Sequence, residues 1–408
     1  MNKTEKITPV ILGADLNAYS MAAALAQAEG LRSHLLARYR TGISSYIGFI
    51  RTEVVSDLTS PQTARRALFD FADRHIGERL LLIAAADWYV EVIEENRDAL
   101  GEKYHFLIPP YRLWKTLKNK RTFVSLLEKY GLPAPKTVIL ERGYDERVFS
   151  EVNYPAVLKP SDSSEYWRHP FVGMKKVYFP KSADEASRVA SKIFAAGYVG
   201  ELLLQDTVGE GAPKMSVLTA FFTREAKCVR AVLADVLIEE SSPSAKGNYA
   251  ALMTRELDAL SKGLISMLER EGYTGIANFD IIADSRGPFV LECNTRQGRS
   301  SDYTRAAGVN LGALLLSDMR GEEITPSFSY PEIYWHSIPH ECVMEYAQDR
   351  ELLAKANLIY ARGDDESPLK PRGALGIGLM RRLYLYIHAR REAKRIREYP
   401  PVRQAEGG

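Results

Sequence analysis

Two strand-turn-helix units near the amino terminus most constrain the fold of this chain. An apolar run from Thr8 to Gly13 ends at a glycine and is followed by a helical pattern over Asn17 to Ala28. The order repeats where the apolar run Leu80 to Ala86 precedes a helical stretch from Val90 to Leu100. Strands that alternate with helices in this way build parallel sheets with helices on their faces. We therefore predict an amino-terminal α/β domain over residues 1–115.

The turns after these two strands carry candidate ligand groups. Gly13-Ala14-Asp15 begins like a dinucleotide fingerprint, but Asp15 and Ala18 stand where the remaining glycines belong, which excludes a Rossmann cofactor site. Asp87 follows the second strand, at an edge where α/β proteins bind ligands. A lone Asp at the start of a helix is more often an N-cap, so both roles of Asp87 stay open.

The length and composition predict a cytoplasmic globular protein. At 408 residues the chain is long enough for two or three domains. Lysines and arginines number 54 against 52 acidic residues, so the net charge of +2 gives no support for a nucleic-acid partner. Cys228, Cys293 and Cys342 have no zinc-site or disulfide spacing, and no apolar run approaches a membrane span.

The middle of the chain has the mixed pattern of an α+β region. Helical patterns cover Lys118 to Tyr130, Ala183 to Ala196 and Arg255 to Glu271, and a loop is expected over Ser241 to Tyr249. The segments with strand-like composition are Pro155 to Pro160, Lys175 to Phe179, Leu202 to Val208, Ser216 to Phe222, Val229 to Val236, Ile276 to Ala283 and Pro288 to Cys293.

The last two of these strands carry the strongest chemical signal. Asn278 and Asp280 are two residues apart on one strand, and Glu292 and Asn294 are two apart on the next. Because strand side chains alternate between faces, each pair shares a face, and the four groups can converge. Oxygen ligands of this kind suit Mg²⁺, which takes one or two protein carboxylates. The alternative is a solvent-facing hairpin whose polar residues have no ligand.

Two lysines and a polar loop precede this hairpin. Lys159 ends the apolar strand Ala-Val-Leu-Lys159-Pro, and Lys120 lies in the helical stretch from Lys118. Each lysine taken alone is more often a surface residue. The segment from Ser161 to Lys176 follows Lys159 and is either a lid over bound phosphates or a loop without a function.

The order of these features resembles that of the ATP-grasp superfamily over roughly residues 1–320. Within it, the phrases Lys-Gly-Asn-Tyr, Gly-Ile-Ala-Asn-Phe-Asp and Asn-Thr-Arg-Gln-Gly-Arg-Ser-Ser are similar to those of the D-aspartate ligases of peptidoglycan synthesis. The resemblance implies an ATP-grasp fold with α/β and α+β parts. It has an amino-terminal α/β domain (1–115), two α+β subdomains that enclose ATP (116–205 and 206–330), and a C-terminal extension (331–408).

The resemblance also assigns roles to individual residues, with ATP and Mg²⁺ as cofactors. It implies phosphate contacts for Lys120, Lys159 and Lys246, and adenine contacts for Gln205, Asp206 and Val208. Asp280, Glu292 and Asn294 would hold magnesium, and Arg296 would meet the acyl phosphate. An acid that binds the ribose in many relatives is replaced by Ala212, so Glu210 is the candidate there. Candidate substrate contacts are Arg296, Arg299, Ser300 and Ser301.

The activity implied is joining of the β-carboxylate of D-aspartate to the side-chain amine of the diamino acid in a peptidoglycan precursor, UDP-MurNAc-pentapeptide. A ligase for another amino acid or a peptide natural product, and a nucleotide-binding protein without turnover, are the alternatives.

The basic stretch from Arg381 to Arg403, interleaved with apolar residues, is either a docked helix with a solvated basic face or a peripheral membrane contact. The sequence does not define an oligomeric state.

Overall fold

Two units, each built from separate stretches of sequence, make up the chain. The computed structural model describes residues 6–161, 163–175, 177–209, 214–242, 245, 247–368, 370 and 378–401. The first unit comprises Met1–Tyr111, Ser216–Asn278 and Asn294–Gly408, and the second comprises Arg112–Met215 and Phe279–Cys293. The hairpin with the predicted magnesium ligands therefore has most of its length in the second unit.

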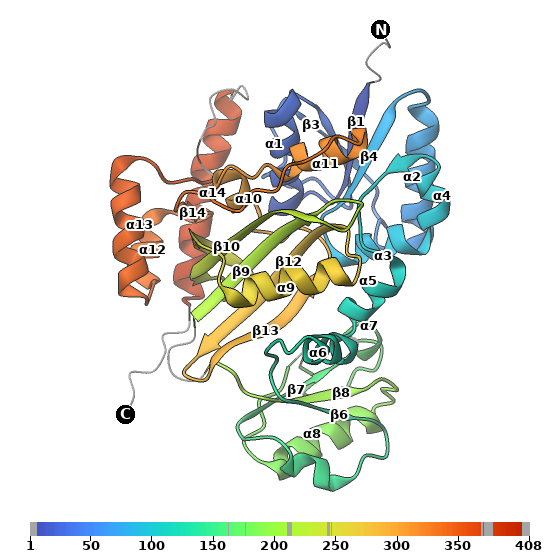
Figure 1. Cartoon of the computed structure of the whole chain (residues 1–408), viewed down its shortest axis with the longest axis vertical. Coiled ribbons are helices and arrows are strands. Elements are labelled where there is room, and N and C mark those ends of the chain that lie inside the picture. Colours follow the sequence, from blue (N-terminus) through green and yellow to red (C-terminus); the bar gives the residue numbers. More distant parts are fainter. Residues whose placement is uncertain are drawn as a thin grey trace. The chain divides into compact units, whose positions relative to one another are not determined.

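The amino-terminal part of the first unit is a parallel sheet, as predicted. Its strand order is β3-β2-β1-β4-β5, so the order reverses between β1 and β4, and every pairing is parallel. Figure 1 shows these strands together with α1 and α2 in blue. The strands are β1 (Ile7–Leu12), β2 (Ser33–Ala37), β3 (Ile50–Val54), β4 (Arg79–Ala84) and β5 (Tyr104–His105).

The helices of this sheet follow from local capping. The side chain of Asp15 accepts a hydrogen bond from the Ala18 amide and starts α1 (Leu16–Glu29), which ends at the left-handed Gly30. The helix predicted over residues 90–100 is interrupted at Asn96, which separates α3 (Asp87–Glu95) from α4 (Arg97–Gly101). The other helices here are α2 (Pro61–Arg74), α10 (Asp302–Ala306) and α11 (Leu311–Arg320).

A six-stranded sheet with the order β13-β12-β9-β10-β11-β14 follows. Its strands are β9 (Lys214–Phe222), β10 (Cys228–Glu239), β11 (Tyr249–Arg255), β12 (Gly275–Asp284), β13 (Gly287–Asn294) and β14 (Tyr334–His336). Helix α9 (Ala259–Arg270) packs against β10 (Figure 1). The sequence analysis was wrong at β11, because the helix expected from Arg255 begins only after the Asp258 N-cap. The apolar residues before it pair with β10 and β14.

Three helices end the first unit: α12 (His340–Tyr346), α13 (Arg350–Arg362) and α14 (Leu379–Glu398). The buried guanidinium of Arg381 in α14 donates hydrogen bonds to the carbonyls of Gly42, Ile43 and Ser45, at 3.2, 2.8 and 3.3 Å. The basic stretch from Arg381 therefore includes a helix that is docked on the first unit, which was one of the two alternatives predicted for it. Within the described ranges, no helix combines the length and apolarity needed to span a membrane.

The second unit contains an antiparallel sheet of three strands in the order β6-β8-β7. The helix predicted from Lys118 to Tyr130 is confirmed as α6, which begins at Lys120 after the Asn119 cap, and Lys118 is the last residue of the preceding α5. The strand predicted over residues 175–179 is wrong, since Tyr178 makes only an isolated bridge with Leu158. The elements are α5 (Tyr111–Lys118), α6 (Lys120–Lys129), β6 (Thr137–Leu140), a 3-10 turn (Glu146–Ser150), β7 (Ala156–Pro160), α7 (Ser163–Tyr166), α8 (Ala183–Ala195) and β8 (Leu202–Asp206).

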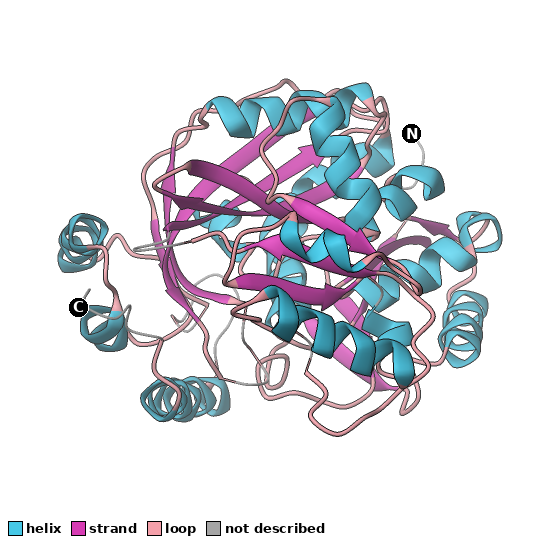
Figure 2. Cartoon of the chain, turned by 90° about the horizontal axis from the view of Figure 1, so that it is seen from below, coloured by secondary structure: helices cyan, strands magenta, loops and turns pink. Residues whose placement is uncertain are grey.

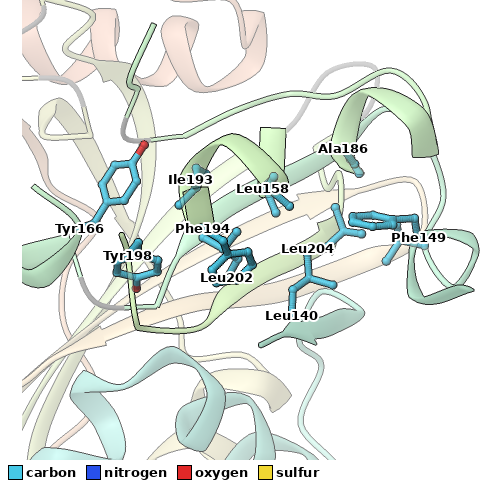
Figure 3. Packing of buried hydrophobic residues seen from close by; sticks show 13 residues of the cluster. Leu140, Phe149, Leu158, Tyr166, Ala186, Ile193, Phe194, Tyr198, Leu202 and Leu204 are labelled. Atoms are coloured by element: carbon cyan, nitrogen blue, oxygen red, sulfur yellow. The ribbon is translucent and has the colours of Figure 1, made fainter. Parts of the chain in front are cut away.

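The core of the second unit lies between this sheet and α8. Leu158 and Leu204 extend from the strands toward Ile193 and Phe194 of α8, and all four are buried (Figure 3). Figure 2 shows the helices and strands of the chain in separate colours. Burial of these apolar side chains holds β7 and β8 in place, and with them Lys159 and Gln205.

The start of β12 depends on a glycine. Gly275 has a φ of +92°, and a Cβ there would lie 2.4 Å from the carbonyl oxygen of Leu107. Gly272 has a φ of +77° but no neighbour within 4 Å of such a Cβ. Gly272→Ala should therefore cost only backbone strain, about 1 kcal/mol of unfolding free energy. Gly275→Ala should cost a further ~1–3 kcal/mol from overlap. Urea denaturation of both variants measures the difference, and equal costs would contradict the close approach of Leu107.

Candidate active site

A buried glutamine fixes the segment after β13 to the carboxyl edge of the parallel sheet. Gln297 is 2% exposed, and its Nε2 donates a hydrogen bond to the Ala84 carbonyl at the end of β4, at 3.1 Å. Asn17, in α1, donates through Nδ2 to the carbonyls of Ala85 and Gln297, at 3.1 and 3.0 Å. The segment is thus held where the strand order reverses, between β1 and β4, which is the usual ligand position in open α/β sheets.

Arg296 is oriented by three oxygens beside this anchor. Its Nη2 lies 2.6 Å from the Asp87 carboxylate and 3.5 Å from the Asn294 side-chain oxygen. Its Nη1 donates to the Gln297 carbonyl at 2.9 Å. The buried Nε has no hydrogen-bond partner among the described residues. The guanidinium is therefore fixed in direction and keeps a donor for an anionic ligand.

Asp87 does not cap the helix that follows β4, and its role toward a ligand stays a prediction. Ala86 is the N-cap of α3, without a side-chain hydrogen bond, and Asp87 is the first helical residue. Its carboxylate instead pairs with Arg296, on a segment more than two hundred residues away in the chain. The N-cap role is wrong, and Asp87 positions a candidate catalytic group.

One of the four converging polar groups is part of the core. Asn278 is 4% exposed, and its side-chain oxygen accepts a hydrogen bond from the Thr219 hydroxyl at 2.9 Å. A Cβ on Gly298 would approach that oxygen to 2.7 Å. Asn278 is therefore packed between β9 and the anchored segment, and Asp280, Glu292 and Asn294 remain the candidate metal ligands.

The carboxylates of Asp280 and Glu292 create a region of negative potential on the hairpin. The thiol of Cys293 is fully enclosed, and burial raises its pKa well above the usual value. The negative charges of Asp280 and Glu292 raise this pKa further, so both carboxylates act on one point. Two carboxylates of this kind fit Mg²⁺, which completes its octahedron with water and phosphate oxygens. The proposed site has only two carboxylates, and among the described residues no cluster of three or more His, Cys, Asp or Glu side chains could hold a metal ion.

Two of the predicted phosphate lysines lie in regular elements of the second unit. Lys159 is half-buried on β7, where it pairs with Leu203 of β8. Lys120 is the first residue of α6, directly after the Asn119 cap. Lys246, like Glu210 and Ala212, lies outside the residues that the structure describes.

The side chains of the predicted nucleotide hinge are engaged within the second unit. Gln205 is 6% exposed and donates through Nε2 to the Thr137 hydroxyl at 2.7 Å. The Asp206 carboxylate accepts hydrogen bonds from the backbone amide and side chain of Asn153, at 2.8 and 3.1 Å. These contacts fix the end of β8, from which Thr207 and Val208 continue.

The turn of the hairpin is tied to this hinge, a contact that the sequence analysis missed. The Asp284 carboxylate accepts from the Gly209 amide at 2.9 Å and forms an ion pair with Arg286, which donates to the Thr207 carbonyl at 2.8 Å. The bonds from Arg286 and Gly209 lower the pKa of Asp284. Nothing local in the Asp284-Ser-Arg-Gly287 phrase indicates this partner.

Comparisons with known proteins agree with this arrangement. No protein-family model matches the chain. A D-aspartate ligase of Enterococcus faecium (strain Aus0004) is 29% identical over 367 residues, which cover 86% of this chain and 86% of that protein. The biotin carboxylase domain of Hydrogenobacter thermophilus 2-oxoglutarate carboxylase, solved with MgADP, has a TM-score of 0.61 at 16% identity, over 80% of this chain and 73% of that one. An ADP complex of N5-carboxyaminoimidazole ribonucleotide synthetase has a TM-score of 0.59 at 14% identity, over 87% and 86% of the two chains.

The chain has the ATP-grasp fold. The predicted fold class is therefore confirmed. The three candidate substrate contacts that follow Arg296 differ in exposure. Ser300 and Ser301 are each 4% exposed, whereas Arg299 is half-buried. The hydroxyl of Ser301 lines a cavity of about 10 Å³ together with Asn17, enough for one water molecule. The roles of these three residues toward a substrate stay predictions.

The anchor can be tested by stability. Gln297→Ala leaves the Ala84 carbonyl without its side-chain donor, and we expect a loss of about 1–3 kcal/mol of unfolding free energy. Gln27→Ala, on the exposed part of α1, is the matched control and should change stability by less than ~0.5 kcal/mol. Chemical denaturation followed by tryptophan fluorescence measures both. Equal effects of the two substitutions would show that Gln297 does not hold the segment.

Proposed function

We propose that this ATP-grasp protein is an ATP-dependent ligase that joins the β-carboxylate of D-aspartate to the side-chain amine of a peptidoglycan precursor. The observation that carries the proposal is the 29% identity to a D-aspartate ligase over 86% of both chains, on a fold shared with nucleotide-bound carboxylases and synthetases. The division into domains at residues 115, 205 and 330 is part of the same proposal.

The chemistry requires activation, because a carboxylate is a poor electrophile. A carboxylate oxygen attacks the γ-phosphorus of ATP, ADP leaves, and an acyl phosphate results. The amine nitrogen then attacks the acyl carbon, loses a proton, and expels inorganic phosphate. Mg²⁺ on Asp280, Glu292 and Asn294 would neutralise phosphate charge. No protein nucleophile is needed for either step.

The chain's own cations complete the neutralisation. Lys120, Lys159 and Lys246 are assigned to the phosphates, and Gln205, Asp206 and Val208 to the adenine, with Glu210 at the ribose. Arg296, held by Asp87, faces the acyl group and stabilises the negative oxygen that develops as the amine attacks. A guanidinium that is already oriented does not have to reorganise during the reaction.

Two other functions use the same residues. A ligase for a different amino acid, or for a peptide natural product, needs the same acyl phosphate. A nucleotide-binding protein without turnover would keep the fold but not need Arg296 fixed by Asp87. The fixed guanidinium favours turnover.

The activity is tested by phosphate release with ATP, Mg²⁺, UDP-MurNAc-pentapeptide and D-aspartate, with L-aspartate, D-glutamate and glycine as parallel substrates. We expect release that depends on both D-aspartate and the acceptor.

Glu292→Gln removes a metal ligand and should lower kcat by about 100-fold or more. Glu225→Gln, on an exposed turn, is the control and should leave kcat unchanged. Full activity of Glu292→Gln would contradict the metal assignment, and release that ignores D-aspartate would contradict the substrate.

The helix α14 has a second face that suits a membrane surface. Leu379, Leu383 and Tyr386 are 82%, 50% and 56% exposed and follow one helical stripe. Exposed basic residues continue the stripe toward the C-terminus: Arg390, Lys394 and Arg397. Arg382 and Arg391 are exposed basic residues beside it. An apolar face next to clustered cations binds anionic lipid surfaces. We place the enzyme in the cytoplasm, with this face against the inner leaflet.

Membrane contact is tested by flotation with vesicles of neutral lipid or with 30% anionic lipid as the chosen test composition. Replacing Leu383 and Arg390 by Glu and Gln, both on the exposed stripe, should abolish binding to the anionic vesicles. The change should leave the unfolding midpoint within the range of surface substitutions. Equal flotation of the variant and the native chain would contradict the proposed face.

A further inference from the structure

A cavity of about 220 Å³ lies within the first unit, at the carboxyl end of β1. Its lining comes from the β1–α1 turn, the loop after β2, the end of β10, the anchored segment after β13, and α14. The groups that matter chemically are Asp15, Glu240, Arg299, Tyr384, His388 and Glu392. The volume is below the ~300–1,000 Å³ of pockets for drug-sized ligands, so the cavity suits a small metabolite better than a nucleotide or a peptide.

Arg299 supplies to this cavity a cation whose Nε makes no hydrogen bond to the described residues. Its Nε is buried and has no hydrogen-bond partner in the part of the chain that the structure describes. Its charge acts on His388 and Glu392 across the cavity, but neither is within hydrogen-bond reach in any described contact. Leaving a buried guanidinium nitrogen unbonded is costly, which indicates that a ligand oxygen completes it.

The acidic groups on α14 and β10 already have their own partner. Arg395 donates from Nη2 to Glu240 at 2.5 Å and also hydrogen-bonds Glu392. Burial raises the pKa of Glu392. His388 is neutral near pH 7, because burial and the charges of Arg395, Arg381 and Arg299 lower its pKa to about 4. One guanidinium is thus shared by two carboxylates, and Arg299 offsets the charge of Glu392 through space without a hydrogen bond to it.

The opposite wall offers an anion. Asp15 is exposed to the cavity, and only its Oδ1 is used, in the cap bond to the Ala18 amide at 3.2 Å. The second carboxylate oxygen of Asp15 is available for a cationic group. A cavity lined by a guanidinium with an unbonded Nε and by a carboxylate with a free oxygen is complementary to a zwitterion.

We propose that this cavity holds the dicarboxylic amino acid, with Arg299 on the carboxylate that is not activated and Asp15 on the ammonium group. The inference rests on the proposed ligase function and adds the residues that select its substrate. Arg296 and Arg299 lie on either side of the Gln297 anchor. In this proposal the carboxylate that is phosphorylated extends out of the cavity toward Arg296, which contacts the proposed metal ligand Asn294 and lines a separate pocket, and Arg299 holds the other carboxylate.

The test compares D-aspartate with its α-amide, which keeps the β-carboxylate but has no negative charge at the α position. The native enzyme should prefer D-aspartate, because the amide leaves Arg299 unpaired. Arg299→Gln should lower the ratio of kcat/KM for the two substrates by about tenfold or more, chiefly through the KM for D-aspartate. The KM for ATP should not change. Arg66→Gln, on the exposed face of α2, is the matched control and should preserve the ratio.

An equal loss of kcat/KM for both substrates in Arg299→Gln would overturn the proposal, because it indicates a structural role. Binding of D-aspartate measured by calorimetry separates this failure from failure of the ligase function. If the native protein shows no turnover with any amino acid, the ligase function fails. The cavity assignment is then supported by D-aspartate binding that Arg299→Gln abolishes, and overturned if the native protein binds no dicarboxylic amino acid.

A second variant tests the cavity without removing a charge. A Cβ on Gly42 would lie 2.2 Å from Cε2 of the Tyr384 ring, so Gly42→Ala must displace that ring from the cavity wall. We expect a higher KM for D-aspartate with little change in the KM for ATP. An unchanged KM for D-aspartate would contradict the location of the amino acid.

Discussion

The hydrogen bonds of Gln297 and Asn17 are the constraint on which the candidate site depends. They join the segment that follows β13 to the carboxyl edge of the amino-terminal parallel sheet. Arg296 and Arg299 are placed by this segment, and both carry a buried Nε with no described partner. A parallel sheet thus positions two cations that are far from it in sequence.

The charges that shift the pKa of nearby groups are negative on the hairpin and positive in the cavity of the first unit. On the hairpin, Asp280 and Glu292 together raise the pKa of the Cys293 thiol, as expected for carboxylates that share a site for a divalent cation. In the cavity of the first unit, burial and the charges of several arginines lower the pKa of His388 to about 4 and keep that ring neutral. Activation of a carboxylate as an acyl phosphate needs cations that bind the substrate carboxylate and protein carboxylates that bind the metal.

The sequence predicted elements whose signal is local and missed those that depend on distant partners. The strand, glycine and helix order of β1 and α1 follows from hydrophobic pattern and the Asp15 cap, and the even spacing of Asp280, Glu292 and Asn294 gave the candidate ligands. In contrast, no strand is predicted over β11, because its pairing with β10 and β14 has no local signal. The Asp87–Arg296 pair and the cavity at Arg299 could not be predicted, because they arise from chain segments brought together only by folding.

The account's central claim is that a carboxylate is activated as an acyl phosphate, and an oxygen label tests this most directly. D-aspartate carrying ¹⁸O in its β-carboxylate is turned over with ATP, Mg²⁺ and UDP-MurNAc-pentapeptide, and the phosphate is analysed by mass spectrometry. The account predicts that each inorganic phosphate released contains one ¹⁸O from the carboxylate, and that the nucleotide product is unlabelled ADP. Unlabelled phosphate, or ¹⁸O in AMP, would contradict it.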